Sequence, residues 1–430
     1  MSRKIDSLKA GQRITEYLRR EDQGLTGPAR PGESGKNSAA AAVRRRHYLP
    51  KRRPLAIGLL SFISIAALAG STAASTRPSA TAGSRKTAAN ATVSSFTCSA
   101  TGSTATAQVP VQGAAADGSA DDTAAIQNAI NAAGQQGGGI VTLPAGTFMI
   151  NGHLVMRNNV DLTGAGPATV IKAGPGFLRT EGTGSGYPII STAGASNTTI
   201  SNLTADQSGD TLRANVPTRL YSYVVEARGS SNVIVNNVYV RNPFTYSIAM
   251  VASTDFCVEN SNVQVSTGAR YDQLDGIHIL DSNSGRVINN VVQSGDDGLA
   301  AHTIYAPVHD VLFANNTVHG GTGDAGLQLA VGGASIYSIT VTDNEFYGSQ
   351  FGIETGYWGD GVGNVSNVTI SGNYIHDLVN GSLSPAVQIG DSGQSGFVQS
   401  VTATGNRVCN AGPITIQPGL GNSVTGTTGC

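Results

Sequence analysis

Three aspartates near the middle of the chain have the types and spacing for acid–base chemistry. Asp296 and Asp297 are adjacent in the stretch QSGDDGLAAHT, and Asp275 lies 21 residues before the first of them, in YDQLDGIHI. When carboxylates are held close together, each negative charge disfavours the next, so the pKa of at least one group rises. The cluster then offers a proton donor beside a base, as cleavage of a glycosidic bond requires. A calcium site and solvated turn aspartates are the two alternatives.

The sequence around these aspartates repeats, and stacked repeats could bring them together. Apolar–polar alternations such as VIVNNVYV, RVINNVVQ and VTISGNYIHD recur, each with an asparagine. The aligned asparagines, 25 to 35 residues apart, are Asn202, Asn237, Asn262, Asn290, Asn316, Asn344, Asn373 and Asn406. Strand patterning at such a period is typical of a solenoid, because one unit cannot bury its apolar face alone. We therefore predict an all-β fold, a single-stranded right-handed parallel β-helix. A β-sandwich, the alternative, would leave the asparagines unexplained.

The predicted coils place the aspartates and several polar side chains on one face. We expect the asparagines to stack at a turn, amide on amide, in the left-handed conformation that asparagine tolerates. A second column, GIHIL, GLAAH, GLQLA and GIETG, follows the first. Because one coil rises about 4.8 Å, Asp275 and Asp297 should be neighbours on the outer surface, with Asp296 at the corner. The outward column beside them holds His278, Ala300, Gln328 and Glu354, and His302 faces the same way.

These outward side chains and two aromatic residues are candidates for substrate binding. Tyr357 and Trp358 follow Glu354 in a glycine-rich loop. The single Trp suits stacking on a sugar ring, and packing on the edge of the β-helix is the alternative. Arg270 and Tyr271 could line a wall of the site. The predicted substrate-binding set is His278, His302, Gln328, Glu354, Tyr357 and Trp358.

A second acidic doublet, in DGSADDTAAIQNAINAAGQQGGG, is assigned a structural role. Asp121 or Asp122 can cap the N-terminus of a helix that begins near Thr123, and the glycine run ends that helix. One apolar face of the helix could cover the open end of the coil stack. That face consists of Ile126, Ala129, Ile130 and Ala133.

The N-terminal part of the chain differs from the rest in charge. Residues 1–53 carry 14 Lys and Arg against 5 Asp and Glu, whereas residues 54–430 carry 13 against 23. The acidic remainder argues against a nucleic-acid partner. The basic flank RRRHYLPKRRP and the apolar run within residues 54–74 resemble an export signal, with a twin-arginine-like RRHYLPK. We expect a secreted protein, and a membrane anchor at residues 55–70, if the signal is not cleaved, is the alternative.

The remaining composition indicates a linker and one large domain. Residues 75–107, rich in Ser, Thr and Ala, are typical of a flexible linker, and residues 108–430 suffice for the β-helix. The four cysteines follow the predicted signal, so disulfides are expected. Cys409 and Cys430 are the favoured pair, because they would close a short C-terminal loop. The cysteines lack the spacing of a zinc site, and we expect no metal and no cofactor.

The motifs DGSADDTAAIQNAI…GGGIVTLPAGTF, LDGIHI and SGDDGLA resemble the polygalacturonases of glycoside hydrolase family 28, within the pectate-lyase-like superfamily of right-handed parallel β-helices. The resemblance extends from near Val111 to near Gly356 and is most specific in the two aspartate motifs. It implies that Asp296 is the general acid and that Asp275 and Asp297 activate water. It also implies that the anomeric configuration is inverted.

The chain departs from that family at three points. Gln273 and Leu274 replace the Asn-Thr before the first aspartate, and Ala325 occupies the position of a histidine. Glu354 replaces the lysine of an Arg-Ile-Lys that holds a uronate carboxylate. A glutamate there would repel galacturonate, so we expect a monomeric glycoside hydrolase that cleaves a neutral or non-pectic polysaccharide. The alternatives are a polysaccharide lyase or epimerase, which would need a cation near the uronate, and a non-catalytic glycan-binding surface solenoid.

Overall fold

The computed structural model describes most of the predicted β-helix. The described residues are Cys98 and residues 106–177, 188–212, 222–265, 274–357, 361–390 and 396–430. The basic residues 1–53, the predicted export signal and nearly all of the predicted linker lie outside them, as do Arg270, Tyr271, Gln273 and Trp358. In this part of the chain, no helix is long and apolar enough to cross a bilayer.

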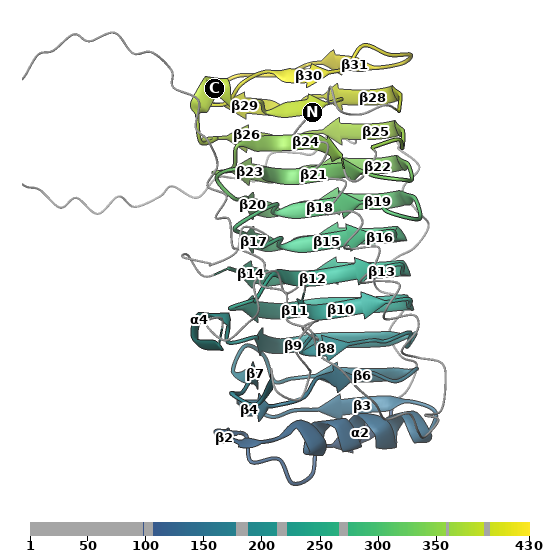
Figure 1. The fold of residues 1–430 in the computed structure, drawn as a ribbon, viewed down its shortest axis with the longest axis vertical. Coiled ribbons are helices and arrows are strands. Elements are labelled where there is room, and N and C mark those ends of the chain that lie inside the picture. Colours follow the sequence, from purple (N-terminus) through teal and green to yellow (C-terminus); the bar gives the residue numbers. More distant parts are fainter. Residues whose placement is uncertain are drawn as a thin grey trace, which may run out of the picture. The chain divides into compact units, whose positions relative to one another are not determined.

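The chain winds into a right-handed parallel β-helix, which confirms the predicted fold (Figure 1). A ten-stranded sheet contains β5 (Leu154–Val155), β8 (Ile190–Ser191), β10 (Tyr223–Arg228), β12 (Tyr246–Val251), β15 (Ile277–Leu280), β18 (Leu299–His302), β21 (Ala325–Val331), β24 (Phe351–Tyr357), β27 (Val387–Ile389) and β30 (Ile414–Ile416). Neighbouring strands in it belong to successive coils and run parallel.

The other two sides of each coil belong to a 21-stranded sheet. Its first strands are β1 (Gln108–Pro110), β2 (Asp117–Asp121), β3 (Gly139–Thr142), β4 (Gly146–Ile150), β6 (Val160–Thr163), β7 (Thr169–Ala173) and β9 (Thr198–Asp206). The middle coils add β11 (Ser231–Arg241), β13 (Thr254–Glu259), β14 (Asn262–Gln264), β16 (Asn283–Ile288), β17 (Val291–Gln293), β19 (Val308–Ala314) and β20 (Thr317–His319). The last coils add β22 (Ile336–Thr342), β23 (Glu345–Tyr347), β25 (Val365–Ser371), β26 (Tyr374–His376), β28 (Val398–Thr404), β29 (Arg407–Cys409) and β31 (Ser423–Thr425).

Identical positions on successive coils form columns of buried apolar side chains. In the ten-stranded sheet, Ile277 pairs with Leu299, Leu299 with Leu327, and Leu327 with Ile353. All four side chains are fully buried. Because the apolar residues alternate with outward ones, one register error would move the core column to the outside. The apolar columns therefore specify how each coil sits on the next.

A ladder of asparagine amides runs through five successive coils. The Asn316 Nδ2 donates to Asn344 Oδ1 at 2.9 Å, and the Asn344 Nδ2 donates to Asn373 Oδ1 at 3.0 Å. The same step joins Asn290 to Asn316 and Asn373 to Asn406. All five side chains are buried. The predicted stacking of asparagines is therefore present on these coils.

One detail of the predicted ladder is wrong, and another holds on only part of the chain. Ser261, and not Asn262, occupies the ladder position, because its backbone N–H donates to Asn290 Oδ1 at 2.9 Å. Asn202 and Asn237 have the predicted left-handed conformation (φ 54° for both), and the Asn237 Nδ2 donates to Asn202 Oδ1 at 2.8 Å. On the buried ladder coils, the left-handed residue is instead the one before the asparagine, as at Asn315 (φ 54°). On these coils the asparagine amides therefore supply hydrogen bonds, and the preceding residue makes the turn.

The helix α2 (Thr123–Gln135) closes the N-terminal end of the stack, as predicted (Figure 1). Its buried residues are the four that the sequence predicted, Ile126, Ala129, Ile130 and Ala133. The carboxylate of Asp122 makes no capping hydrogen bond, because it accepts the backbone N–H groups of Ala115 and Ala116 instead. Asp121 Oδ1 accepts the N–H of Thr123 at 3.1 Å and so satisfies the first turn.

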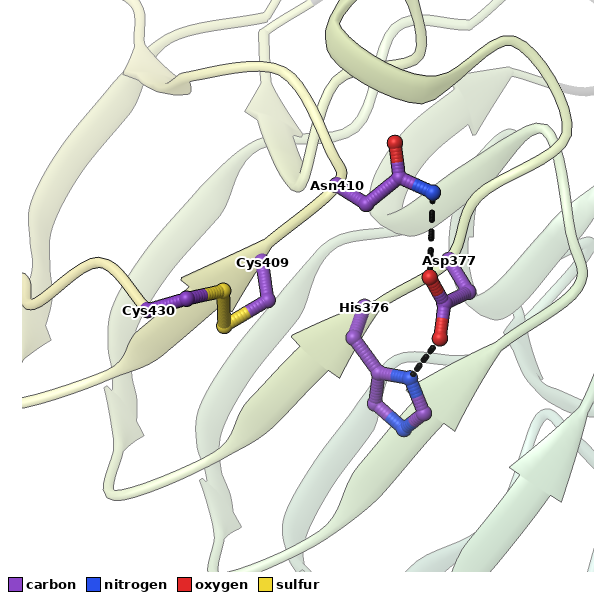
Figure 2. The surroundings of a disulfide bond; sticks show 5 residues. All are labelled: His376, Asp377, Cys409, Asn410 and Cys430. Carbon is purple, nitrogen blue, oxygen red and sulfur yellow. Dashed lines mark hydrogen bonds and ion pairs between the residues drawn. A yellow bond between two sulfur atoms is a disulfide. The ribbon is translucent and has the colours of Figure 1, made fainter.

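Two disulfides tie the described chain together. The Cys409–Cys430 disulfide joins β29 to the C-terminus, beside the contacts of His376 and Asn410 with Asp377 (Figure 2). The Cys98–Cys257 disulfide, which the sequence did not predict, spans 159 residues and attaches Cys98 to β13. Closing so long a loop removes more freedom from the unfolded chain than closing the 21-residue C-terminal one.

We expect Asn316→Ala to lower the free energy of unfolding by about 2–4 kcal/mol, because it leaves several buried hydrogen-bonding groups unpaired. These groups include the carbonyl of Val287 and the backbone N–H of Asn290. Asn262→Ala is the matched control, since Asn262 lies outside the ladder, and should cost less than about 1 kcal/mol. Thermal and denaturant unfolding would measure both, and equal losses would contradict the structural role of the ladder.

Candidate active site

The register of β15 and β18 brings the three predicted aspartates together. Asp275 and Asp297 each stand two residues before a paired core position, so they occupy the same place on successive coils. The N–H of Gly276 donates to the carbonyl oxygen of Asp297 at 2.9 Å. One carboxylate oxygen from each of Asp275, Asp296 and Asp297 lies within 4.8 Å of the other two. These residues form the aspartate cluster, whose catalytic role stays a prediction.

A column of glycines lets the aspartate-bearing turns approach each other. Gly276 and Gly298 directly follow Asp275 and Asp297. A Cβ on Gly276 would collide with the carbonyl oxygen of Gly298, and one on Gly298 would lie 2.8 Å from the carbonyl oxygen of Gly326. The coils are therefore too close for any larger residue at these points. This explains why Asp275 and Asp297 are each followed by glycine.

The aspartate cluster is more buried than the sequence predicted. Asp275 and Asp297 are each 3% exposed, although the predicted position was on the outer surface, and Asp296 is half-buried. Burial, and then the charge of Asp275, raise the pKa of Asp297 well above its usual range. Burial, and then the charges of Asp275 and Asp297, raise the pKa of Asp296 to about 11. The cluster therefore keeps protons at neutral pH that exposed carboxyl groups lose.

Asp324 is a fourth carboxylate that the sequence analysis did not include. It occupies the position of Asp296 on the next coil, since Leu299 pairs with Leu327. Its side chain is hydrogen-bonded to Asp296, and that contact also raises the pKa of Asp296. The signal was present in the sequence, because GDAGL repeats GDDGL with the first aspartate kept. Asp324 can therefore share a proton with Asp296.

The predicted outward column is present beside the aspartate cluster. The Nε2 of His302 lies 3.1 Å from Gln328 Oε1, and the Gln328 Nε2 donates to Glu354 Oε1 at 3.1 Å. His278 lies one coil before Ala300 in the same column, and its Nδ1 is 3.1 Å from Asp275 Oδ2. Burial, and then the neighbouring His278, lower the pKa of His302 well below its usual range. At neutral pH the His302 imidazole is therefore uncharged.

Two tyrosines that the sequence analysis missed continue this face. The rings of Tyr223 and Tyr246 stack at 5.0 Å between centroids, and Tyr246 meets His278 edge-on at 5.4 Å. His278 in turn meets His302 edge-on at 4.4 Å. The tyrosines precede the aspartates on earlier coils, so only the register reveals the contact. Tyr357 ends β24, and the predicted sugar contacts of Tyr357 and Trp358 stay predictions.

Comparison with known proteins identifies the family. The family model described as "Rhamnogalacturonase A/epimerase, pectate lyase-like" matches residues 108–375. The chain belongs to this family. The predicted pectate-lyase-like superfamily is thus confirmed, whereas membership of glycoside hydrolase family 28 stays a prediction.

The similar proteins act in more than one way on polysaccharides, as their names state. Mannuronan C5-epimerase AlgE3 of Azotobacter vinelandii is 32% identical over 250 residues, which are 55% of this chain and 13% of the epimerase. Alginate lyase 7 of the same organism is 32% identical over 212 residues, which are 46% of this chain and 23% of the lyase. This chain therefore spans less than a quarter of the length of either relative.

A solved structure supports the fold independently. The polygalacturonase of Erwinia carotovora superposes with a TM-score of 0.57 at 17% identity, covering 76% of this chain and 94% of that protein. An identity this low shows that the two proteins share a fold, but it does not show that they share an activity.

We expect Asp297→Asn to stabilise the protein by about 1–2 kcal/mol near pH 8, because it removes the cost of keeping protonated a carboxyl group that ionises freely in the unfolded chain. The raised pKa means that the contribution of Asp297 to stability is complete below its unfolded pKa and is lost as the pH rises through its folded pKa. The gain should therefore vanish near pH 4. Melting temperatures across this range would measure it, with the exposed Asp343→Asn as the control. A gain that is equal at both pH values would contradict the assignment.

Proposed function

We propose that this protein modifies a uronate-containing polysaccharide by removing the proton at C5 of a sugar, as an epimerase or a lyase. The aspartate cluster supports the reaction centre, because two of its three members have raised pKa values and lie within 4.8 Å of each other. The names of the relatives support the substrate class, since mannuronan and alginate are uronate polymers.

The aspartate cluster can supply both the acid and the base for this reaction. A cluster that shares protons titrates as a unit, with one carboxyl group protonated while another is ionised. The ionised group would take the C5 proton, and the electron pair would delocalise into the uronate carboxyl group. In an epimerase a proton returns to C5 from the opposite side of the ring. In a lyase the bond from C4 to the glycosidic oxygen breaks, and the protonated group gives its proton to the leaving oxygen.

This proposal replaces the expectation of a neutral substrate. That expectation was based on Glu354, whose Oε1 accepts a hydrogen bond from Gln328 within the column. A protonated Asp296 can donate a hydrogen bond to a uronate carboxylate, so a basic side chain is not the only group that can bind one. Arg228 faces the same side as His302 but lies three coils away and is bound to Glu226.

Hydrolysis is the second candidate, because the aspartate cluster combines a proton donor and a base in the way that glycosidases require. The family description also includes a rhamnogalacturonase. Export, which the N-terminal composition supports, suits either reaction on a polymer.

One assay separates these reactions. We expect the protein, incubated in D2O with polymannuronate, alginate or polygalacturonate, to introduce deuterium at C5 or to form unsaturated uronates that absorb in the ultraviolet. Neutral α- and β-glucans serve as control substrates and should stay unchanged. Saturated reducing ends without C5 exchange would replace the proposal with hydrolysis. Binding without any product would support the non-catalytic solenoid.

We expect Asp296→Asn to lower kcat by about 10²–10⁴-fold, because an amide cannot replace the carboxyl group as a proton donor. The melting temperature should not fall, since the substitution keeps the shape of the side chain and replaces a carboxyl group that the fold forces to keep its proton. Asp343→Asn is the control with the same chemical change at an exposed site. Near-normal turnover by Asp296→Asn on the accepted polymer would refute the role of Asp296.

A further inference from the structure

His278 is buried beside the aspartate cluster with its hydrogen-bonding capacity unused. The side chain is 4% exposed, and neither ring nitrogen has a hydrogen-bond partner among the described residues. Its Nδ1 lies 3.1 Å from Asp275 Oδ2, but without the geometry of a hydrogen bond. A buried polar atom that lacks a partner costs about 1–3 kcal/mol, so in native proteins such atoms bind an ion or water or serve in catalysis.

The stack of rings explains the burial of His278 but not its unpaired nitrogens. Tyr246 and His302 flank the ring at centroid distances of 5.4 Å and 4.4 Å. An apolar ring of similar size would pack there equally well and would leave no polar atom unsatisfied. The imidazole therefore indicates that something else binds a ring nitrogen.

Three donor groups meet at this point. One ligand atom from each of Asp275, His278 and His302 lies within 4.8 Å of the other two. All three side chains are buried, and they come from the turn before β15, from β15 itself and from the next coil, β18. A site on successive coils of one sheet is positioned by rigid elements.

We propose that Asp275, His278 and His302 bind one divalent transition-metal ion, with zinc as the best fit to two imidazoles and one carboxylate. Imidazole nitrogen suits Zn²⁺, whereas Ca²⁺ and Mg²⁺ prefer oxygen ligands. Three protein ligands leave a position for a substrate group, as in catalytic zinc sites. The role of this ion rests on the proposed function, because a cation here would neutralise the uronate carboxylate while the C5 proton is removed.

The direct test measures metal binding by the purified, chelator-treated full chain, without substrate. We expect one Zn²⁺ per chain by calorimetry and by metal analysis after dialysis, and a melting temperature that rises with Zn²⁺. His278→Ala should weaken binding by at least about 10–100-fold and abolish the rise in melting temperature. Binding of Zn²⁺ by His278→Ala as by the wild type, or no binding by the wild type, would overturn the proposal.

Two control variants locate the ion. Asp296→Asn changes the aspartate cluster without removing a proposed ligand, and it should keep the affinity for Zn²⁺. His376→Ala removes an imidazole on the other sheet that contacts Asp377 (Figure 2) and also Glu345, and it should keep that affinity as well. Loss of binding in either variant, or a preference for Ca²⁺ over Zn²⁺, would place the ion elsewhere and overturn the proposal.

The design also covers variants that fold poorly. If His278→Ala does not fold, His278→Asn removes the same imidazole, and His302→Ala removes the other one. Circular dichroism without metal identifies the variants that fold. Because binding is measured without polymer, its failure is distinct from the failure of the proposed reaction. If the protein binds Zn²⁺ but leaves every polymer unchanged, the metal site is supported and the proposed reaction is wrong.

Discussion

The parallel register of successive coils is the constraint on which the rest of the structure depends. Each coil repeats the position of the last, so a side chain gains neighbours far away in the sequence. The apolar columns and the asparagine ladder both specify this register, the first through packing and the second through buried hydrogen bonds. A slip by one residue would break both at once, and every column on the outer face would be lost with them.

In the candidate active site, the register of the coils brings together carboxyl groups that would repel each other. Buried like charges are unfavourable, and no local interaction would assemble Asp275, Asp296, Asp297 and Asp324 on their own. The stack of coils supplies the favourable energy, and the glycine column removes the side chains that would hold the turns apart. The repulsion between carboxyl groups is thus confined to one site, where a reaction needs a group that holds or releases a proton.

The fold itself is compatible with several reactions, so the reaction depends on the residues of the site. Mannuronan epimerases, an alginate lyase and a polygalacturonase all resemble this chain or its fold. Their names state different reactions, so the shared fold does not determine the reaction. In this chain the buried pair His278 and His302 lies beside the carboxylates. The chemistry of that pair determines how the negative charge of a uronate could be balanced.

The sequence alone determined the features that repeat: the parallel β-helix, the capping helix, the column of His278, Gln328 and Glu354, and the pairing of Asp275 with Asp297. These follow from periodicity, because a repeated pattern puts equivalent residues on the same face. Only the tertiary structure decided the features that depend on how coils of unequal length fit together. Those features are Ser261 in the ladder, the contact of Asp324 with Asp296, the tyrosine stack, the Cys98–Cys257 disulfide and the depth of burial of the aspartates. Burial and unpaired nitrogens arise from neighbours on other coils and other segments, and no stretch of sequence contains that information by itself.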